Sequence, residues 1–457
     1  MKKIVILAGF LMTLSLFTAC SNNDTPTPDE PQTSEEFYGE PFDRVPSIDN
    51  IVMYEANERV FASDNSFNAI TDRLDEIKSL GVNILWLMPV NEQGIENAIG
   101  SPYCIKNYVA TEPEYGTLDD LRELVLQAHN REMAVIIDWV ANHTSWDSEW
   151  VSDHKDWYTQ DDEGNIIPPV GTNWSDVADL NYNNHDMRDA MISSMKYWVR
   201  EANVDGFRCD AADWIPAGFW RDAVYELKNM QEGRTVLMLA EGTDPINLQA
   251  GFDLDYGWNF CDVLEGLYAG TKSTADLYAS HQNEFGQIPE GKQKLRFTTN
   301  HDRASENSPI SKYNGQQGAL SAYVVSTTLG GVPLMYSSQE VGYSSTINFF
   351  NFVNVGWNNN QDIYQSYQKI MDIYNSFEAM KTGALETFTD DNVVCFTRSS
   401  DSENILIIAN IKNTEISFTV PDDFVSESRI NMIKESSVTL EATIDLSPYE
   451  FLILKKQ

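Results

Sequence analysis

Short apolar runs alternate with amphipathic stretches along most of this chain. Seven of the runs have the length and composition of buried strands, and residues 252–255 supply an eighth. The seven are residues 51–54, 84–88, 134–139, 204–209, 236–240, 295–299 and 332–336. The segments between them carry apolar side chains at helical spacing, as in residues 118–128, where Thr117 is the expected N-cap and Asp120 its capping-box partner. Strands and helices in this alternation predict an α/β fold, a (β/α)8 TIM barrel.

Two segments depart from this alternation. Residues 144–178 hold four tryptophans, many polar residues and a turn sequence at 162–165, which predicts a short hairpin-bearing insertion after the third strand. Near residue 379 the pattern changes to short β runs separated by polar turns, which predicts a C-terminal antiparallel β-sandwich domain. The predicted domains are the barrel at 48–143 and 179–378, the insertion at 144–178 and the β-domain at 379–457.

Composition limits the class of partner. The hydrophobic fraction of 42% is that of a globular protein, which excludes disorder over most of the 457 residues. Lys and Arg number 31 against 69 Asp and Glu, and the resulting net charge of −38 repels phosphate backbones and anionic surfaces. We therefore expect a neutral or cationic partner and no nucleic acid, and we expect the protein to be a monomer.

The N-terminal segment has the features of an export signal. Lys2 and Lys3 precede an apolar run, residues 4–17, that is too short to span a bilayer as a mature helix. The run ends in Leu-Phe-Thr-Ala-Cys, which resembles the lipobox of bacterial lipoproteins, so residues 1–19 are the predicted signal peptide and Cys20 the predicted lipidation site. Residues 20–47 then form a flexible linker. An ordinary cleaved signal with an incidental cysteine is the alternative.

Lipidation implies a location as well. The protein would be exported as an outer-membrane lipoprotein, similar to those of Bacteroides-type bacteria, and would contact the membrane through the lipid anchor only. The cell surface and the periplasmic face both remain open.

The other four cysteines are widely spaced and include no Cys-x-x-Cys pair. This spacing indicates neither a zinc site nor a dense disulfide framework. We therefore expect Cys104, Cys209, Cys261 and Cys395 to be buried as small hydrophobic side chains.

Polar residues end four of the predicted strands, which is where the chemistry of a barrel enzyme lies. The four ends are residues 138–143, 206–210, 239–242 and 299–302. A single Asp at such a position commonly caps the following helix. Three carboxylates at one mouth, those of Asp210, Glu241 and Asp302, instead favour acid/base chemistry on a neutral substrate, because burying them together is costly unless they are used.

Neighbouring residues predict different roles for two of these carboxyls. Arg208 and Asp210 are two residues apart on one strand and share a face, so the guanidinium is expected to keep Asp210 ionised, as a nucleophile requires. Glu241 follows an apolar strand, which favours a raised pKa and a protonated carboxyl, as a general acid requires.

The four strand ends, in their order and spacing, closely resemble the signature regions of the alpha-amylase family, glycoside hydrolase family 13. The resemblance extends from about residue 52 to the C-terminal β-domain. It implies that Asp210 is the nucleophile, Glu241 the acid/base and Asp302 the third carboxylate, which binds ring hydroxyls and stabilises the transition state. It also implies that the insertion is similar to the family's domain B and the β-domain to its domain C.

The resemblance further implies a sugar-binding site around the carboxylates. Arg208, His143 and His301 match the sugar-binding positions of the family. Tyr103, in Ser-Pro-Tyr, matches the tyrosine that stacks on the sugar whose bond is broken.

The chain departs from the family pattern on the leaving-group side. Many family members carry a Lys-His pair after the nucleophile, whereas this chain has Asp213 and Trp214. Trp214 would either stack on a pyranose or belong to the core. The four tryptophans of the insertion either line a glucan groove, for which Trp174 is the chosen candidate, or pack within the insertion.

Calcium is the one cofactor that the resemblance raises, and no organic cofactor is expected. Asn142 and Asp179 match two ligands of the family's structural calcium site, and calcium needs six to eight oxygens. Further oxygens could come from Asp153, Asp156, Asp161 or Asp162. Alternatively the short insertion lacks the site, and Asn142 and Asp179 bond to each other's loops.

The predicted function is hydrolysis of α-1,4-glucosidic bonds in starch, glycogen or maltooligosaccharides, with retention of anomeric configuration, as part of carbohydrate catabolism. Retention requires the two reacting carboxyls to lie about 5–5.5 Å apart. One alternative is a transglycosylating, cyclodextrin-acting or pullulan-acting member of the same family. The other is a catalytically silent starch-binding surface lipoprotein, against which three intact carboxylates weigh.

Overall fold

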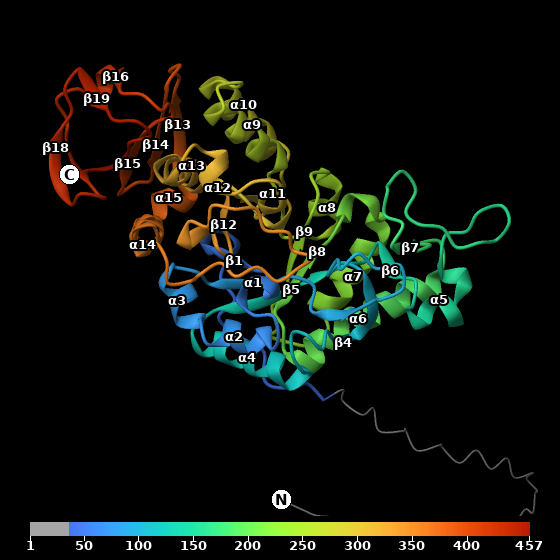
Figure 1. Ribbon diagram of the computed structural model, residues 1–457. Helices are drawn as coiled ribbons and strands as arrows, with labels where there is room; N and C mark the ends of the chain where they lie inside the picture. The colour runs from blue at the N-terminus through green and yellow to red at the C-terminus, as the bar shows by residue number, and fades with distance from the viewer. Residues whose placement is uncertain (1–35) are drawn as a thin grey trace, which may run out of the picture. The chain divides into compact units, whose positions relative to one another are not determined.

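The structure is a computed structural model that describes residues 36–457 (Figure 1). The predicted signal peptide, Cys20 and most of the predicted linker lie outside the described residues. Eight parallel strands close into a barrel in the order β1-β12-β11-β10-β9-β8-β5-β2, which confirms the predicted TIM barrel. These strands are β1 (Met53–Ala56), β2 (Ile84–Leu87), β5 (Ala134–Trp139), β8 (Gly206–Cys209), β9 (Leu237–Ala240), β10 (Leu254–Tyr256), β11 (Gln293–Arg296) and β12 (Val332–Tyr336).

Helices follow the barrel strands and surround the barrel (Figure 1). The predicted capping box begins α4: the Thr117 side chain accepts from the backbone N–H of Asp120, and the Asp120 carboxylate accepts from the backbone N–H of Thr117. The α-helices are α1 (Glu58–Phe61), α2 (Ser66–Thr71), α3 (Leu74–Ser79), α4 (Leu118–Asn130), α5 (Glu149–Asp153), α6 (His185–Ala202), α7 (Ala217–Lys228), α8 (Pro245–Ala250), α9 (Trp258–Tyr268), α10 (Thr274–Phe285), α11 (His301–Glu306), α12 (Pro309–Lys312), α13 (Gln316–Leu329), α14 (Gln361–Ser376) and α15 (Glu378–Thr382). Short 3-10 turns are η1 (Ile48–Asn50), η2 (Lys155–Trp157), η3 (Ala212–Trp214), η4 (Gln339–Val341) and η5 (Asp422–Phe424).

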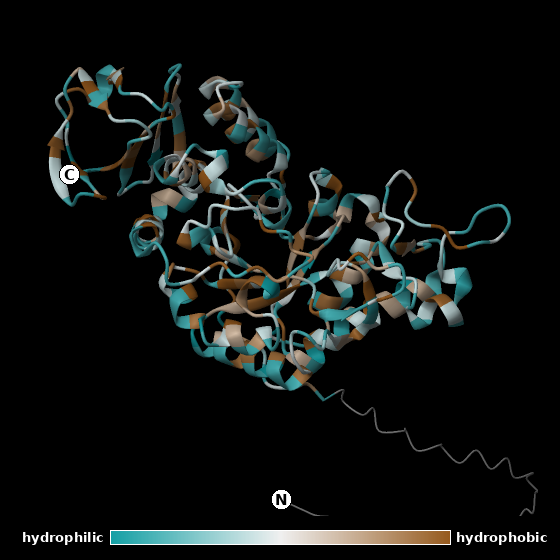
Figure 2. Ribbon diagram, in the orientation of Figure 1, coloured by the Kyte–Doolittle hydropathy of each residue, from teal (hydrophilic) through white to brown (hydrophobic). Residues whose placement is uncertain are grey.

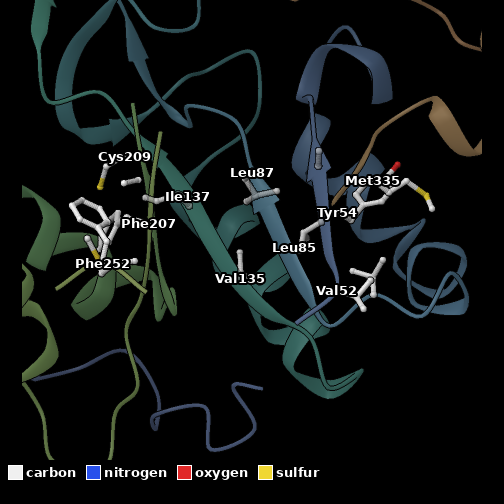
Figure 3. Close-up of a cluster of buried hydrophobic side chains, with 14 of the residues drawn as sticks. Val52, Tyr54, Leu85, Leu87, Val135, Ile137, Phe207, Cys209, Phe252 and Met335 are labelled. Atoms are coloured by element: carbon white, nitrogen blue, oxygen red, sulfur yellow. The ribbon is translucent and has the colours of Figure 1, made fainter. Parts of the chain in front are cut away.

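Two apolar layers hold the barrel together, because successive residues of a strand face opposite sides of the sheet. The interior layer contains residues such as Met53, Trp86 and Leu239. The outer layer lies between strands and helices, and Figure 3 shows part of it, including Leu85, Val135 and Phe207 from neighbouring strands. Figure 2 shows the same arrangement by hydropathy, with brown strands enclosed by helices whose outward faces are largely teal. Burial on both faces explains why the strands are nearly continuous apolar runs.

Strand β11 is displaced from its predicted position. It begins at Gln293, before the apolar run that starts at Leu295, and Gln293 pairs with Leu254 of β10. Lys294 and Arg296 face the helix layer, where Lys294 Nζ lies 2.7 Å from Asp255 Oδ2 and Arg296 pairs with Glu284 of α10. These paired charges are buried, so the strand does not show in an apolar pattern.

Two hairpin-like pairs extend the barrel at the carboxyl ends of its strands. Strands β3 (Asn91–Gln93) and β4 (Ile105–Thr111) pair after β2, and strands β6 (His143–Ser145) and β7 (Val177–Asp179) pair after β5. The segment between β6 and β7 projects away from the barrel in Figure 1. Its turn is closed by Asp161, which accepts hydrogen bonds from the backbone N–H of Glu163 and Asn165, as the turn sequence predicted.

The C-terminal part is an antiparallel β structure, as predicted. Its main sheet has the order β13 (Ala384–Phe388), β14 (Val393–Ser399), β15 (Asn404–Asn410), β20 (Phe451–Lys456), β17 (Ser428–Asn431) and β18 (Ser436–Thr439). Strands β16 (Ile416–Thr419) and β19 (Thr443–Leu446) form a second, two-stranded sheet. Phe418 and Leu446 of the small sheet pack on Cys395 and Leu406 of the large one, so an apolar core separates two β layers.

The four cysteines within residues 36–457 are unpaired and buried, as their spacing predicted. Over the same residues, no helix combines the length and apolarity needed to cross a membrane.

Candidate active site

The polar strand ends meet in one cleft of about 440 Å³ at the carboxyl-terminal mouth of the barrel. All three predicted carboxylates line it, and so do most of the other residues predicted to bind substrate. The cleft is lined by Ile99, Ser101, Tyr103, His143, Trp174, Asp176, Val177, Asp210, Ala211, Asp213, Trp214, Glu241, Gly242, Thr243, Trp258, His301, Asp302, Phe349 and Phe350. Arg208 lies beneath this surface and is fully buried.

Arg208 links the carboxyl groups of the site. Its Nη1 donates to Asp210 Oδ1 at 2.9 Å and to Asp138 Oδ1 at 2.9 Å. Its Nη2 lies 2.9 Å from Glu241 Oε2, an ion pair without the alignment of a hydrogen bond. Asp210 and Glu241 therefore contact the two arms of one guanidinium, which places the two carboxyl groups side by side in the cleft.

The backbone after β8 fixes the position of Glu241 relative to Asp210. Ala211 has a φ of +44°, a left-handed conformation that is costly for a residue with a side chain other than Asn or Asp. In that conformation its backbone N–H donates to Glu241 Oε2 at 2.8 Å. The next residue, Ala212, donates its N–H to the carbonyl oxygen of Glu241 at 2.9 Å. The segment that follows Asp210 is thus bonded to both the backbone and the carboxyl group of Glu241.

Burial raises the pKa of the three carboxyls that contact Arg208, which are those of Asp138, Asp210 and Glu241. Burial, with the negative charges of Asp210 and Asp302, raises the pKa of Glu241 from 4.5 to about 7 against the opposing effect of Arg208. Burial also raises the pKa of Asp138 to about 6 and raises that of Asp210 above 3.8, although Arg208 lowers both. The raised pKa that the sequence predicted for Glu241 agrees in direction with the structure. For Asp210, the guanidinium of Arg208 lowers the pKa as expected, but desolvation has the larger effect, so the net shift of the pKa is upward.

Glu241→Gln is expected to stabilise the protein at neutral pH. The folded state holds a proton on Glu241 up to about pH 7, whereas an unfolded Glu releases it near 4.5, so ionisation destabilises the folded state as pH rises between these values. The amide removes that cost, and we expect a gain on the order of 3 kcal/mol above pH 7 and none below pH 4.5. Thermal unfolding at several pH values measures it. The exposed Glu232→Gln is the control, and an equal gain at every pH would contradict the assignment.

Tyr103 and His301 form the floor of the site beside these carboxyls. The Tyr103 hydroxyl lies 2.9 Å from His301 Nε2 and donates to Asp138 Oδ2 at 3.1 Å, and the two rings stack at a centroid separation of 5.4 Å. His301 Nδ1 lies 2.6 Å from the buried carboxylate of Glu55, and its Nε2 lies 3.4 Å from Asp302. Burial lowers the pKa of His301, but Asp302 and Glu55 outweigh this and raise it to about 9. His301 is therefore a cation at neutral pH.

His143 and two tryptophans form the opposite edge. His143 Nε2 lies 3.1 Å from the Tyr103 carbonyl oxygen, and burial lowers the pKa of His143 to about 4, so its imidazole is neutral. The Trp174 ring meets the His143 ring edge-on at 5.6 Å and stacks on Trp214 at 5.1 Å. Trp214 is 54% exposed, which excludes the core position that the sequence left open. Trp174 also lines the cleft, whereas Trp157 and Trp150 pack against each other.

Asp213 occupies the position where many family members carry the lysine of the Lys-His pair, and its hydrogen bonds are structural. Its carboxylate accepts hydrogen bonds from the backbone N–H of Thr243 at 2.9 Å and from Asn247 Nδ2 at 2.6 Å. Asp213 thus holds the loop that follows Glu241.

The residues present do not fit the calcium site that the sequence raised. Within residues 36–457 no three His, Cys, Asp or Glu side chains are grouped to hold a metal. Asn142 and Asp179 lie near each other, because His143 pairs with Asp179 across β6 and β7, but Asn142 Nδ2 contacts His143 Nδ1 at 3.3 Å. No chemical step is therefore assigned to calcium.

Chelation is accordingly expected to leave the protein unchanged. After dialysis against EDTA, we expect the melting temperature and the rate of starch hydrolysis to match those of protein kept in millimolar CaCl2. Differential scanning calorimetry and a reducing-sugar assay measure both. A fall of several degrees that CaCl2 reverses would restore the calcium site predicted from Asn142 and Asp179.

The residues of the site that were not predicted from sequence include Asp138, Glu55 and Phe349. Asp138 and Glu55 are fully buried carboxylates that contact Arg208 and His301. The sequence pattern could have predicted both, because each is an acidic residue within or directly after an apolar strand, where a buried carboxylate requires a partner. Phe349 packs on His301 at 5.2 Å from a loop that carries no such signal.

The barrel and the carboxyl pair at its carboxyl-terminal mouth define an enzyme of acid/base type. The family described as "Alpha amylase, catalytic domain" matches residues 62–384, more than half of the chain, so the chain belongs to the alpha-amylase family of glycoside hydrolases.

Relatives and solved structures agree with this assignment. The chain is 26% identical to alpha-amylase MalA of Haloarcula japonica over 83% of its own length and 58% of that relative. It is 26% identical to a beta/alpha-amylase of Paenibacillus polymyxa over 90% of its own length and 36% of that relative, so it spans only part of both proteins. A crystal structure of the noncanonic maltogenic alpha-amylase AmyB from Thermotoga neapolitana superposes with a TM-score of 0.81 at 26% identity, covering 90% of this chain and 99% of the other.

Proposed function

We propose that this protein is a retaining glycoside hydrolase that cleaves α-1,4-glucosidic bonds in starch, glycogen or maltooligosaccharides. The observation that carries the proposal is the contact of Asp210 and Glu241 with the two arms of the Arg208 guanidinium, each at 2.9 Å. A retaining mechanism needs two carboxyl groups close enough to reach one anomeric centre, one ionised and one protonated. Their different environments support that division, since Glu241 has a pKa of about 7.

In the first step Glu241 donates its proton to the glycosidic oxygen while Asp210 attacks the anomeric carbon. The bond to the leaving sugar breaks, and Asp210 becomes covalently attached to the glycone. In the second step Glu241, now ionised, takes a proton from water, and the resulting hydroxide displaces Asp210 with overall retention. Arg208 holds the Asp210 carboxylate oriented before attack and stabilises its charge when it leaves.

The surrounding side chains supply sugar recognition. The neutral imidazole of His143, the charged imidazole of His301 and the half-exposed carboxylate of Asp302 offer different hydrogen-bonding groups for ring hydroxyls. The Tyr103 ring faces the same space as an apolar platform for a pyranose. As the transition state gains positive charge at the ring, Asp302 provides a nearby negative charge.

On the leaving-group side, we assign sugar stacking to the Trp174 and Trp214 pair. Trp214 follows Asp210 by four residues, and both tryptophans line the cleft with Glu241. A stacked, partly exposed aromatic surface binds the apolar face of a sugar without a charged side chain.

One assay tests the proposal. Mature protein and its Asp210→Asn variant are incubated with soluble starch, pullulan and cyclodextrins, and reducing ends are measured. We expect release from starch by the wild type and not by the variant. Equal release by both would dismiss Asp210 as nucleophile, whereas no release by either would favour a binding protein. Faster release from pullulan or cyclodextrins would favour those alternatives within the family.

We also propose that the protein is an exported lipoprotein anchored through Cys20, which lies outside the described residues. The support is the N-terminal sequence alone, with its basic start, short apolar run and lipobox-like end. Cys20→Ala is expected to move the protein from the membrane fraction to the soluble fraction of a Gram-negative host. An unchanged distribution would rule out the anchor.

A further inference from the structure

Two loops meet across one end of the cleft. The first connects β3 to β4 and contains Ile99, Gly100 and Ser101, and the second follows β12 and contains Phe349 and Phe350. Four of these five residues line the cleft, and we call the five together the glycone wall. The loops touch directly, because a Cβ atom on Gly100 would lie 3.2 Å from the carbonyl oxygen of Phe350.

Arg59 of α1, the helix that follows β1, forms hydrogen bonds with both loops. Its Nη1 donates to the carbonyl oxygen of Gly100 at 2.7 Å and to that of Phe349 at 3.3 Å. Its own carbonyl accepts from the backbone N–H of Val353 at 2.9 Å. Arg59 is 6% exposed, so these bonds are shielded from water. The loops are thus joined through a buried guanidinium that contacts backbone atoms of both.

The glycone wall contacts residues of the site for the sugar whose bond is broken. Phe349 packs edge-on against Tyr103 at 5.9 Å and against His301 at 5.2 Å, and these residues belong to the site for the sugar whose bond is broken. Glu241, which protonates the leaving oxygen, lines the cleft together with Trp214 and Thr243 at the ends of other strands. A glucan bound across Asp210 therefore has its leaving part toward Trp214 and its non-reducing part toward the glycone wall.

We propose that the glycone wall blocks the non-reducing end of the cleft, so that the enzyme binds few glucose units on that side and cleaves near the non-reducing ends of α-glucans. This inference rests on the proposed function, because it assigns the cleft's two ends from the roles of Tyr103 and Glu241. A long glucan enters with its non-reducing end against Phe350 and Ile99. The leaving part extends past the exposed Trp214 into solvent, where chain length is not limited.

The test compares p-nitrophenyl α-maltoheptaoside with the same compound blocked by a 4,6-ethylidene group on its non-reducing glucose. Substrate loss is followed by chromatography at equal concentrations. We expect the wild type to consume the blocked compound at least 20-fold more slowly. Equal rates would overturn the inference and leave the proposed function standing. Consumption of neither compound would overturn the proposed function and this inference with it.

Variants of the glycone wall test whether these residues cause the slower consumption of the blocked compound. Arg59→Met keeps the aliphatic stem but removes the bonds to both loops, and we expect it to raise the ratio of blocked to free consumption by at least tenfold. A double variant, Ile99→Ala with Phe350→Ala, trims the wall without disturbing Arg59 and is expected to raise the same ratio. Trp214→Ala is the control at the other end, where both rates fall and the ratio stays constant. A ratio unchanged in both wall variants would contradict the proposal.

Discussion

Asp210→Asn is expected to lower kcat on maltooligosaccharides by about 10⁴-fold or more, with a smaller change in KM. The amide cannot form the covalent intermediate, whereas other side chains that line the cleft, such as Tyr103 and His301, stay in place to bind sugar. A loss of this size corresponds to about 5 kcal/mol of transition-state stabilisation. Steady-state kinetics on maltoheptaose measures it.

Two further variants make this result interpretable. The asparagine of Asp210→Asn can deamidate to aspartate and regenerate the wild type, whereas the alanine of Asp210→Ala cannot. Activity that Asp210→Asn shows and Asp210→Ala lacks therefore comes from trace wild-type protein. Asp391→Asn makes the same change at an exposed turn of the C-terminal domain and should keep full activity. The nucleophile would have to be sought elsewhere if Asp210→Ala retained a tenth of the wild-type kcat.

Glu241→Ala is expected to lower hydrolysis of natural maltooligosaccharides by about 10³-fold, because both proton transfers lose their group. An α-maltosyl fluoride needs no protonation to lose fluoride, so the first step should survive in the variant. The covalent intermediate then accumulates, since no base activates water. Added azide, which needs no base, should restore turnover and give α-maltosyl azide, the product of two inversions.

The pH profile provides an independent check on the same residue. In the wild type, kcat/KM should fall as pH rises through about 7, where Glu241 loses its proton, and should fall at low pH where Asp210 gains one. With α-maltosyl fluoride and azide, the Glu241→Ala variant should lack the high-pH fall. A fall that persists near pH 7, or a β-maltosyl azide product, would assign the acid to another residue.

The alternation of apolar runs was sufficient to predict the barrel, because a parallel strand buried on both faces has few polar positions. It failed at β11, where Lys294 and Arg296 face the helix layer and are paired with carboxylates from distant segments. Such pairing depends on tertiary contacts that no local pattern encodes.

Some features of the site could likewise be predicted from the sequence, and others could not. Asp210 and Glu241 were predictable because each follows a strand directly, and strand ends converge in a barrel. Asp302 was predictable because the segment between β11 and α11 reaches the same mouth. The net pKa of Asp210 was not, because residue spacing gives the neighbour that lowers it and not the degree of burial that raises it. The contact of Gly100 with Phe350 joins loops some 250 residues apart and became visible only in the fold.

Mechanism-based trapping tests the central assignment most directly. The protein is incubated with 5-fluoro-α-glucosyl fluoride, whose ring fluorine slows both steps, and is analysed by intact mass spectrometry and peptide mapping. The account predicts one added glycosyl group, located on Asp210 and absent in Asp210→Asn. An adduct on Glu241 or Asp302, or consumption of the reagent with inverted product and no adduct, would contradict it.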